Sequence, residues 1–589
     1  MMNDFAFGNY LFLLRTRKGL SQKELARALR VSDKAVSKWE NGRAKPKSAT
    51  LLAAAALLGV SADELLSGGK RITASRDGGA ALSPLSFSQS KLLPNSGRNN
   101  CMNLIPARSA ENYDYLCTWS NQLRAARKLG LTGAGCANMR DALTDDRLFG
   151  AVNYYHPYDE SYRIGLYLVL DDGWDVPFGS ENSAKAPNVF GRCDPDPEKF
   201  PNYGATPVER LRTLNRKVQA MGYCGLGLWI SPQMSGEDRA HPADLEQGRA
   251  YWRARARWCA EAGVRYWKID WGVHCADAEY RRMMTEEARA AAPDLIIEHG
   301  VCQPPYTQLM SDPLDRVRKT QSILPLSDVF RLYDVAEPFR NSSMLMRLDE
   351  ALSAAGSAPE WNTAGILNAE TCAEISASMG CAIGLMRFAE DDLGAKACLR
   401  WHRLAPPFSV YEGEYRRSAE TLTDSFYFDR NLVDWSGNVR GQKLEETAPA
   451  VMARNCALPQ VEADGLRPFV CASCNPRTGA YAIAAIRRTV NPNIDVIAPA
   501  RVTFEVGAPE IPVGVFGCFD QLTLVYTEPV SDRRVFAQDM LDDHAVDVTE
   551  QVRIDGSCVT LDGDSLRCFG RRSRSDSDTT EPSLVLALR

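Results

Sequence analysis

The stretch VRYWKIDWG, residues 264–272, places a lysine and an aspartate two positions apart in an otherwise apolar run. Successive side chains of a strand point to opposite faces, so Lys268 and Asp270 share one face. Such charges are costly to bury among apolar residues unless they pair or bind something. An ammonium group beside a carboxylate lowers the carboxylate's pKa and keeps it ionised. The pattern therefore predicts a carboxylate that is held charged and can act as a nucleophile.

Seven further apolar stretches predict strands, and helical segments such as 207–222, 243–263 and 277–293 lie between them. The eight predicted strands are residues 113–119, 164–172, 224–231, 264–271, 294–300, 327–334, 358–367 and 380–388. Eight strand–helix units over roughly 290 residues match a TIM barrel in number and size. A doubly wound open sheet is the alternative, but no glycine-rich phosphate fingerprint follows any of these strands.

Polar side chains stand toward the C-terminal ends of the predicted strands, where the active groups of a TIM barrel gather. These residues are Trp119, Asp171, Asp172, Lys268, Asp270, Glu298, Arg331 and Asp334. Each alone could be structural, as a turn residue or half of an ion pair. Carboxylates at four strand ends of one barrel are hard to explain by stability alone, because like charges repel. Two carboxylates across a pocket suit glycoside hydrolysis, in which one attacks the anomeric carbon and the other protonates the leaving oxygen.

The stretches LVLDDGW, GLGLWISPQ, RYWKIDWG and, less closely, WNTAGIL with GLMRF resemble the melibiase clan of retaining α-galactosidases and α-N-acetylgalactosaminidases. The resemblance covers residues 110–400 and implies a TIM barrel followed by a β-sandwich. It implies that Asp270 is the nucleophile and Asp334 the acid/base. It further implies substrate-binding roles for Trp119, Asp171, Asp172, Lys268, Glu298 and Arg331, with Glu298 near the sugar 2-position and Arg331 near the acid/base.

Two positions depart from the clan's pattern. The interval from Arg331 to Asp334 is one residue short, so Glu337 is an alternative acid/base. Thr363 stands where the clan carries an acidic residue, which would alter one pocket wall and leaves the galactose specificity open. No cofactor and no metal are expected, since no second pair follows the CxxC of Cys471 and Cys474.

Residues 8–68 carry the signals of several short helices. Ser21 with Glu24 forms a capping box, and Ser32 can cap a helix over residues 33–40. The stretch SQKELARALRVSDKAVSKWENGRAKP resembles the Cro-type and phage-repressor helix-turn-helix. The resemblance implies that residues 33–40 lie in the major groove of double-stranded DNA. It also implies that the DNA-binding residues are Gln22 and Ser37 at phosphates, with Lys34 and Lys38 facing the DNA.

Charge distribution agrees with a DNA-binding head. Residues 1–70 carry twelve Lys and Arg against six Asp and Glu, whereas the whole chain has a net charge of −5. The lysines and arginines of a basic head can bind DNA phosphates by electrostatic attraction. A helical protein-binding module is the alternative. Heads of this class bind weakly as monomers, so a homodimer is expected.

The sequence thus predicts a multidomain protein with an all-α helix-turn-helix head, an α/β TIM barrel and a C-terminal antiparallel β-sandwich. The predicted bounds are 8–68 for the head, 69–109 for a flexible linker, 110–405 for the barrel, 406–464 for a connecting region and 465–589 for the sandwich. The N-terminus lacks the pattern of a signal peptide, and the longest apolar run is too short to span a bilayer. Seventeen cysteines without export indicate reduced thiols and a cytoplasmic location.

The combined expectation is a cytoplasmic retaining α-glycosidase of the α-galactosidase type, joined to a DNA-binding domain. Its partners would be a carbohydrate and double-stranded DNA, with no membrane. The alternative is a sugar-sensing transcriptional regulator whose barrel is weakly active or inactive and serves as the ligand-binding domain.

Overall fold

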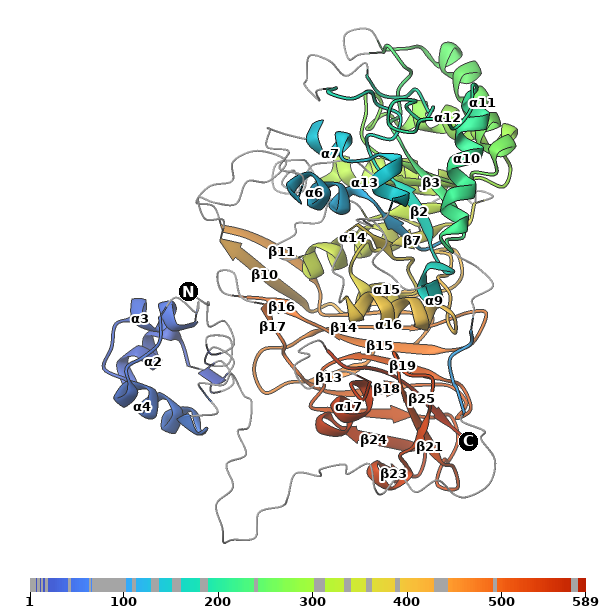
Figure 1. Cartoon of the computed structure of the whole chain (residues 1–589). Helices are drawn as coiled ribbons and strands as arrows, with labels where there is room; N and C mark the ends of the chain where they lie inside the picture. The colour runs from blue at the N-terminus through green and yellow to red at the C-terminus, as the bar shows by residue number, and fades with distance from the viewer. Residues whose placement is uncertain are drawn as a thin grey trace.

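The computed structural model of the chain describes most of residues 102–589 and part of the head (Figure 1). In the head, the described residues are 7, 11, 14, 15, 18, 20–40, 44–62 and 65. Beyond residue 101, the residues left undescribed are 108–112, 129–136, 151–159, 181–188, 238–241, 301–312, 333–339, 356–362, 387–391, 428–442, 491–494 and 574–580.

Eight parallel strands form a closed barrel. They are β1 (Tyr115–Cys117), β2 (Tyr167–Leu170), β3 (Gly225–Ile230), β4 (Tyr266–Ile269), β5 (Ile296–Gly300), β6 (Val329–Arg331), β7 (Ile366–Asn368) and β8 (Gly384–Leu385). Neighbours pair in chain order from β1 to β7, and β8 pairs with β1. A parallel bridge between Asn368 and Ala382 joins β7 to the residues before β8 and closes the ring. The predicted eight-strand barrel is confirmed.

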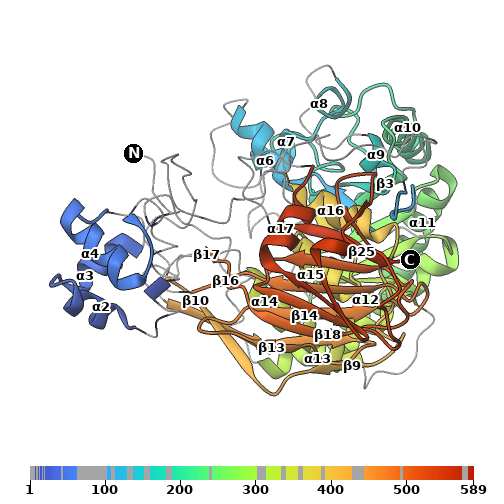
Figure 2. The ribbon, with the colours of Figure 1, turned by 90° about the horizontal axis from the view of Figure 1, so that it is seen from below.

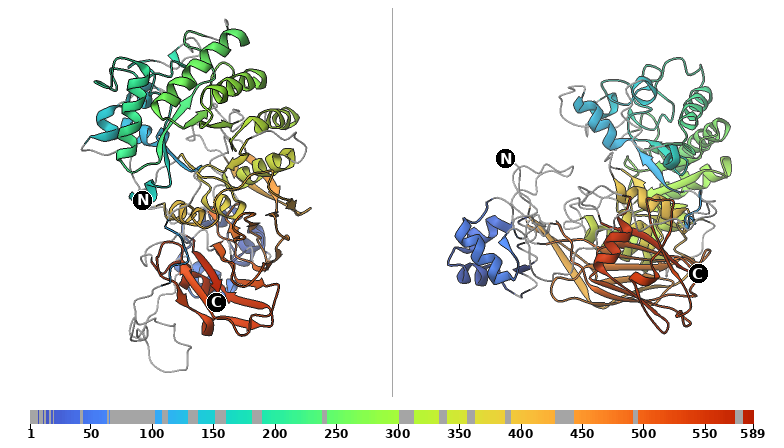
Figure 3. Two further views of the ribbon diagram at one scale, coloured as in Figure 1. Left: turned by 90° about the vertical axis from the view of Figure 1, so that its right-hand side faces the viewer. Right: turned by 60° about the horizontal axis from the view of Figure 1, so that its bottom comes forward.

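Helices cover the outer face of the barrel strands (Figure 3). They include α6 (Trp119–Lys128), α10 (Pro207–Ala220), α11 (Leu245–Ala262), α12 (Ala278–Ala291), α13 (Pro313–Ile323), α14 (Arg340–Ala355), α15 (Ala373–Met379) and α16 (Leu393–His402). Short helices α7 (Ala137–Asp141), α8 (Asp145–Phe149) and α9 (Glu160–Arg163) lie before β2. The sequence sets several helix starts: Thr206 and Glu209 form a capping box at α10, and Asp244 and Gln247 form one at α11.

Inward-facing side chains fill the barrel in layers, as in other barrels of eight strands. The lower layers include Tyr115, Tyr167 and Tyr266, and the ring centroid of Tyr266 lies 5.5 Å from that of Tyr115 and 5.3 Å from that of Tyr167. On β4 to β7, the inward positions become polar two residues farther toward the C-terminal ends: Lys268 follows Tyr266, Glu298 follows Ile296, Arg331 follows Val329 and Asn368 follows Ile366. The strand alternation that makes the core apolar below therefore delivers charged groups to the barrel mouth, the C-terminal end of the strands.

A β-sandwich follows the barrel, and its strands can be followed in Figure 2. One sheet has the order β22-β21-β25-β19-β15-β14-β12-β9, and the other β13-β18-β20-β24-β23. The first sheet consists of β22 (Val546–Asp547), β21 (Val535–Asp539), β25 (Ser583–Leu588), β19 (Val513–Gly517), β15 (Tyr481–Ile486), β14 (Phe469–Cys474), β12 (Val451–Arg454) and β9 (Tyr415–Arg417). The second consists of β13 (Gln460–Glu462), β18 (Arg501–Glu505), β20 (Gln521–Val525), β24 (Cys558–Asp562) and β23 (Arg553–Asp555). Apolar residues of both sheets form one core between them.

Most strand pairs of the sandwich are antiparallel, as expected, but β12 with β14, β15 with β19 and β18 with β20 are parallel. Within residues 406–464, expected as a connection, β9 and β12 already belong to the first sheet. The same region contributes β10 (Thr421–Tyr427), which pairs with β11 (Lys443–Pro449) as a separate ribbon. A second small pair joins β16 (Arg488–Thr489) to β17 (Asp495–Val496), and α17 (Gly563–Gly570) packs on β21.

Helices α15 and α16 lie between the barrel and the first sheet of the sandwich (Figure 1). Trp401 of α16 is buried there, with its ring centroid 6.0 Å from that of Phe516. A Cβ atom at Gly514 would lie 2.8 Å from the Trp401 ring, so only glycine admits this contact. The end of the predicted linker also docks on the sandwich, since the Leu104 N–H donates to Gln538 Oε1 at 2.6 Å.

The head contains α2 (Gln22–Ala28), α3 (Asp33–Glu40) and α4 (Ser48–Leu58). Ser21 caps α2 with the reciprocal Glu24 bond that the sequence predicts. Arg15 binds the buried carboxylate of Glu40 through Nε at 2.6 Å and Nη2 at 3.2 Å. This pair ties the first part of the head to the end of α3 and fixes that helix against an apolar core that contains Val36 and Trp39.

The fourteen cysteines within the described part of the chain are free thiols. Across those same residues, no helix is both long and apolar enough to cross a membrane.

Candidate active site

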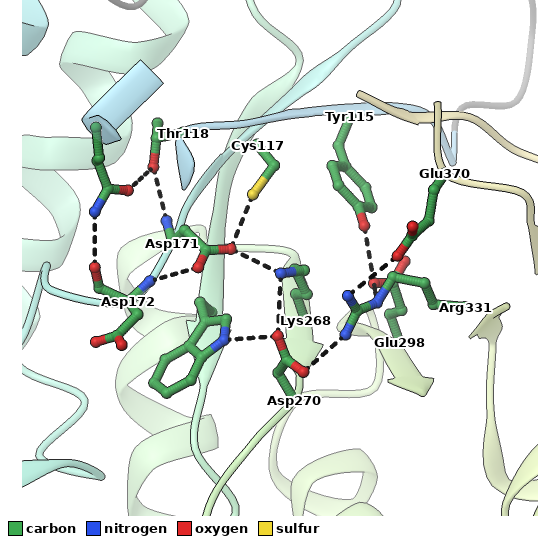
Figure 4. Close-up of polar contacts among 12 residues, drawn as sticks. Tyr115, Cys117, Thr118, Asp171, Asp172, Lys268, Asp270, Glu298, Arg331 and Glu370 are labelled. Atoms are coloured by element: carbon green, nitrogen blue, oxygen red, sulfur yellow. Dashed lines mark hydrogen bonds and ion pairs between the residues drawn. The ribbon is translucent and has the colours of Figure 1, made fainter. Parts of the chain in front are cut away.

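Lys268 lies between two carboxylates at the barrel mouth. Its Nζ lies 2.7 Å from Asp171 Oδ2 and 3.3 Å from Asp270 Oδ2 (Figure 4). Lys268 is fully buried, and Asp171 and Asp270 are 4% and 6% exposed. Burial alone would lower the pKa of Lys268, but Asp171 and Asp270 outweigh it and raise that pKa above its ordinary value. The ammonium therefore stays charged and links the carboxylate that follows β2 to the carboxylate that follows β4.

Asp270, the first residue after β4, is held ionised by Arg331, Lys268 and Trp229. Arg331 Nη2 lies 3.0 Å from Asp270 Oδ1, and Trp229 Nε1 donates to Asp270 Oδ2 at 2.9 Å. Lys268 binds the same Oδ2 atom. Burial raises the pKa of Asp270, but Arg331, Lys268 and the Trp229 hydrogen bond together hold the pKa well below its usual value. The carboxylate carries its charge at any working pH, as a nucleophile must.

Glu298 accepts three hydrogen bonds, forms an ion pair and is closed to solvent. Its Oε2 accepts from Tyr266 Oη at 2.8 Å and from Asn368 Nδ2 at 2.9 Å. Its Oε1 accepts from Tyr115 Oη at 3.1 Å and lies 3.2 Å from Arg331 Nε. Burial raises the pKa of this carboxyl despite Arg331. With four partners and no exposed surface, Glu298 orients Arg331 from below.

The two aspartates of the DDG turn after β2 have different surroundings. The Asp171 N–H donates to Thr118 Oγ1 at 2.8 Å, and Asp171 Oδ2 also accepts from Cys117 Sγ at 2.9 Å. The Asp172 carboxylate turns away and binds Arg140 of α7 by two parallel hydrogen bonds of 2.8 and 2.7 Å. Burial raises the pKa of Asp172, although Arg140 opposes it. Asp171 thus faces Lys268, whereas Asp172 is committed to Arg140.

The tryptophans occupy the rim and the wall of the mouth. Trp119, the first residue of α6, is half-buried and packs against the interior cluster of the barrel. Trp229 of β3 contacts Asp270, and its carbonyl oxygen accepts from Trp174 Nε1 at 2.9 Å. Trp174 is fully buried, so it supports Trp229 rather than presenting a surface.

Glu370 belongs to the site and is absent from the sequence-based set. It follows β7, and Arg331 Nη1 lies 3.5 Å from its Oε1. Burial raises the pKa of Glu370 to about 7, against Arg331 and Lys268, which lower it. The sequence placed the seventh strand at residues 358–367, but β7 spans Ile366–Asn368. A strand ending at Asn368 would have marked Glu370 by the same signal that marks Asp171 and Asp270.

Thr363 lies elsewhere than expected, and this corrects the pocket-wall assignment. It precedes β7, and its Oγ1 donates to the carbonyl oxygen of Pro325, before β6, at 3.4 Å. Both positions are at the N-terminal ends of their strands, opposite the mouth. The cause is again the later start of β7. Asp334 and Glu337, the two candidates for the acid/base, lie outside the described residues.

The DNA-facing residues expected in the head lie on α2 and α3. Lys34 and Lys38 are exposed on α3, and Ser37 between them is half-buried. Gln22 is half-buried, and its Nε2 donates to Glu40 Oε2 at 2.6 Å. One face of α3 thus presents two ammonium groups. Gln22 donates a further hydrogen bond to the Glu40 carboxylate that Arg15 binds.

The fold and the site define a helix-turn-helix domain joined to a (β/α)8 barrel with a charged mouth and a β-sandwich. Comparison supports both resemblances drawn from the sequence. Residues 11–65 match the family model described as helix-turn-helix. The chain is 45% identical over 67 residues to the HTH-type transcriptional activator BcrR of Enterococcus faecalis. The aligned region covers 11% of this chain and 33% of that protein.

The barrel region has weaker matches. The chain is 30% identical over 105 residues to alpha-galactosidase C of Emericella nidulans, covering 17% of this chain and 14% of that protein. A solved structure, a GH27 β-L-arabinopyranosidase of Geobacillus stearothermophilus, aligns over 76% of this chain and 93% of its own, with 12% identity and a TM-score of 0.34. The chain thus spans one third or less of the length of these two curated relatives.

Proposed function

We propose that the barrel is a retaining α-glycoside hydrolase of the α-galactosidase type. The observation that carries the proposal is the Asp270 carboxylate, held ionised between Lys268, Arg331 and Trp229 at the mouth of a closed parallel barrel. Active groups of such barrels lie at this end of the strands. The α-galactoside specificity rests on the short similarity to alpha-galactosidase C and on the DDGW and KxD stretches.

The proposed reaction has two displacements. One oxygen of Asp270 attacks the anomeric carbon while a carboxylic acid protonates the departing glycosidic oxygen, and a covalent glycosyl–enzyme forms. Water, deprotonated by the same acid's conjugate base, then attacks the anomeric carbon and releases Asp270. The proposed substrate-binding or positioning residues are Asp171, Asp172, Lys268, Glu298 and Arg331, with Trp119 at the rim. Asp334, or Glu337 in its place, is the acid/base that the sequence resemblance implies.

The contacts favour a nucleophile over a structural ion pair for Asp270. A buried pair needs one partner of opposite charge, whereas Asp270 has two cations and an indole donor. These additional partners stabilise the negative charge of Asp270 before substrate binds, so the surrounding groups need not reorganise during the reaction. A nucleophile must also be reached by substrate, and Asp270 is 6% exposed.

A panel of nitrophenyl α-glycosides tests the proposal. We expect the wild-type protein to hydrolyse the α-galactoside and Asp270→Ala to lose about three orders of magnitude or more in kcat/KM. A 5-fluoro glycosyl fluoride should label Asp270, with the site read by mass spectrometry of the digested protein. If the wild-type protein neither cleaves any α-glycoside nor becomes labelled, the hydrolase proposal is wrong.

The head supports a second function in the same chain: double-stranded DNA binding by a homodimer, coupled to sugar binding in the barrel. This is the sensor alternative, and the observation that favours it is the helix-turn-helix match over residues 11–65. We infer that Lys34, Lys38 and Ser37 of α3 face the DNA, with Gln22 beside them. A gel shift of the full chain on selected operator DNA, with and without galactose, measures the coupling. Sugar-independent DNA binding would remove the sensor role and leave hydrolysis unaffected.

A further inference from the structure

Glu370 differs from the other carboxylates of the mouth in how little holds it. Its side chain has one polar partner within the described residues, Arg331 Nη1 at 3.5 Å. Glu298 has four partners, Asp172 is bound twice by Arg140, and Asp171 is bound by Lys268. These three carboxylates are thus held by close contacts, and Glu370 is not.

The backbone holds Glu370 in place. Its φ is +46°, in the left-handed region that residues other than glycine, asparagine and aspartate seldom adopt. The Glu370 N–H donates to Asn368 Oδ1 at 2.8 Å, while Asn368 Nδ2 donates to Glu298. The surrounding contacts therefore impose a conformation that costs of order 1–3 kcal/mol, and strain of this kind is concentrated at functional sites.

Glu370 and Asp270 lie on the same guanidinium. Arg331 binds Asp270 through Nη2 and Glu370 through Nη1, and Figure 4 shows the two carboxylates on either side of it. The Glu370 side chain is 12% exposed, against 0% for that of Glu298. A group that exchanges a proton with water in each cycle needs such access, and Glu298 lacks it.

We propose that Glu370, in place of the Asp334 or Glu337 that the sequence resemblance implies, is the general acid/base of this site and acts on the glycosidic oxygen opposite Asp270. The inference rests on the proposed hydrolase function and names the proton-transfer residue in it. In the first step the Glu370 carboxyl gives its proton to the leaving oxygen as the C–O bond breaks and Asp270 bonds to the anomeric carbon. In the second step the Glu370 carboxylate takes a proton from water as water displaces Asp270.

The charges around Glu370 agree with a proton held near neutral pH. Burial raises its pKa to about 7; Arg331 and Lys268 lower the pKa, and the like charges of Glu298 and Asp270 raise it. The charged or titratable groups that face Glu370 are Arg331 on β6, Lys268 on β4, Asp270 directly after β4, Glu298 on β5, Tyr115 on β1 and Cys372 before α15. A catalytic acid works best with a pKa close to the working pH.

The test compares Glu370→Gln with wild type on two α-galactosides, one with a poor leaving group such as methanol and one with a dinitrophenolate. We expect kcat/KM to fall about 10²–10⁴-fold for the poor leaving group and much less for the good one. The alkaline limb of the pH profile should disappear, and azide should restore turnover with formation of the α-glycosyl azide. Glu374→Gln is the matched control, because Glu374 is a carboxyl four residues on that faces Glu581 and Arg487 instead.

Three outcomes are distinguishable. Glu370→Gln could lose activity equally on both substrates, or on neither, while Asp334→Asn or Glu337→Gln loses far more on the substrate with the poor leaving group. In that case Glu370 is not the acid/base and the hydrolase function stands. If wild type shows no turnover and no label on Asp270, both proposals are wrong. Labelling of Asp270 in Glu370→Gln by the fluorinated galactosyl fluoride, which needs no acid, shows that this variant folds with an intact site.

Discussion

Arg140 and Asp172 form a buried two-point pair: Arg140 Nε lies 2.8 Å from Oδ1 and Nη2 lies 2.7 Å from Oδ2. The Arg140 side chain has no exposed surface, and that of Asp172 is 9% exposed. Arg140 belongs to the short helix α7, 32 positions earlier in the chain. The pair therefore fastens the segment before β2 to the turn that carries Asp171.

Removing one partner of the Arg140–Asp172 pair should destabilise the protein more than removing both partners. Asp172→Asn leaves a buried guanidinium without its counter-charge, so we expect a loss of about 3–5 kcal/mol in the free energy of unfolding. The double variant Arg140→Met with Asp172→Asn should recover part of that loss, and chemical denaturation of the four proteins measures the coupling. Additive losses would contradict the structural role of the pair.

Removing the Lys268 charge should move the acidic limb of the pH profile. Asp270 must be ionised to attack, and Arg331 and Lys268 both lower its pKa. In Lys268→Met the positive charge of Arg331 remains but that of Lys268 is lost, so the pKa of Asp270 rises. On acidification, activity is then lost at a higher pH than in wild type. Profiles of log kcat/KM against pH measure the shift. Lys268→Arg keeps the charge and should retain the wild-type limb; an unshifted limb in the methionine variant would contradict the assignment.

Glu370 should make folding stability depend on pH. Burial raises its pKa to about 7, whereas an exposed glutamate in the unfolded chain titrates near 4.3. Between these values the folded state keeps a proton that the unfolded state has lost, so wild type loses stability as pH rises through this window. Glu370→Gln does not titrate there.

The free energy of unfolding of Glu370→Gln relative to wild type should therefore grow from pH 4 to pH 7, by up to about 3 kcal/mol. Denaturant titrations at several pH values measure the difference. Asp175→Asn is a useful comparison, since burial also raises the pKa of Asp175 to about 7. Both variants should show this pH dependence of stability, but only the Glu370 variant should lose the alkaline limb of activity. A pH-independent difference for Glu370→Gln would show that its carboxyl is ionised in the folded protein.

Gly384 of β8 allows the side chains that hold Glu298 to meet. A Cβ atom there would lie 2.7 Å from Tyr115 Oη and 2.8 Å from Asn368 Nδ2. Gly384→Ala should displace both side chains, loosen Arg331 and destabilise the fold by about 1–3 kcal/mol. Gly225→Ala is the control, because the nearest atoms to a Cβ at Gly225 lie 3.6 Å away. Thermal melts and kcat/KM measure both variants, and equal effects of the two substitutions would contradict the crowding argument.

The sequence predicted the barrel and most of its charged mouth because strand alternation is a local property. Lys268 and Asp270 share a face in any strand that covers both, and Asp171 directly follows a buried apolar run. Local signals failed where strands were short. β7 has three residues, and its misplacement put Thr363 at the wrong end of the barrel and hid Glu370.

Partners distant in the chain also escaped the sequence analysis. The sequence around Asp172 gives no indication of Arg140 as its partner, and the sequence around Glu298 gives none of Tyr115 or Asn368. These contacts form only once the barrel has closed. The left-handed conformation of Glu370 has no sequence signal either, since the residue type disfavours it. Residue types at strand ends therefore identify a site, while closure of the ring decides which carboxylates are tied and which remain available.

The exposed lysines of α3 should contribute to DNA affinity through charge. Lys34 and Lys38 are both exposed on this helix, and neutralising a phosphate releases bound counterions. Lys34→Ala or Lys38→Ala in the full chain should weaken binding and reduce the slope of log affinity against log salt by about 1 each if the lysine meets a phosphate. A lysine that contacts a base edge should instead relax sequence preference with less change in slope. Fluorescence anisotropy at several salt concentrations separates these results, and Arg501→Ala on the exposed face of β18 should leave the slope unchanged. Slopes equal to wild type in both lysine variants, with sequence preference also unchanged, would mean that α3 does not face the DNA and that the head binds another protein.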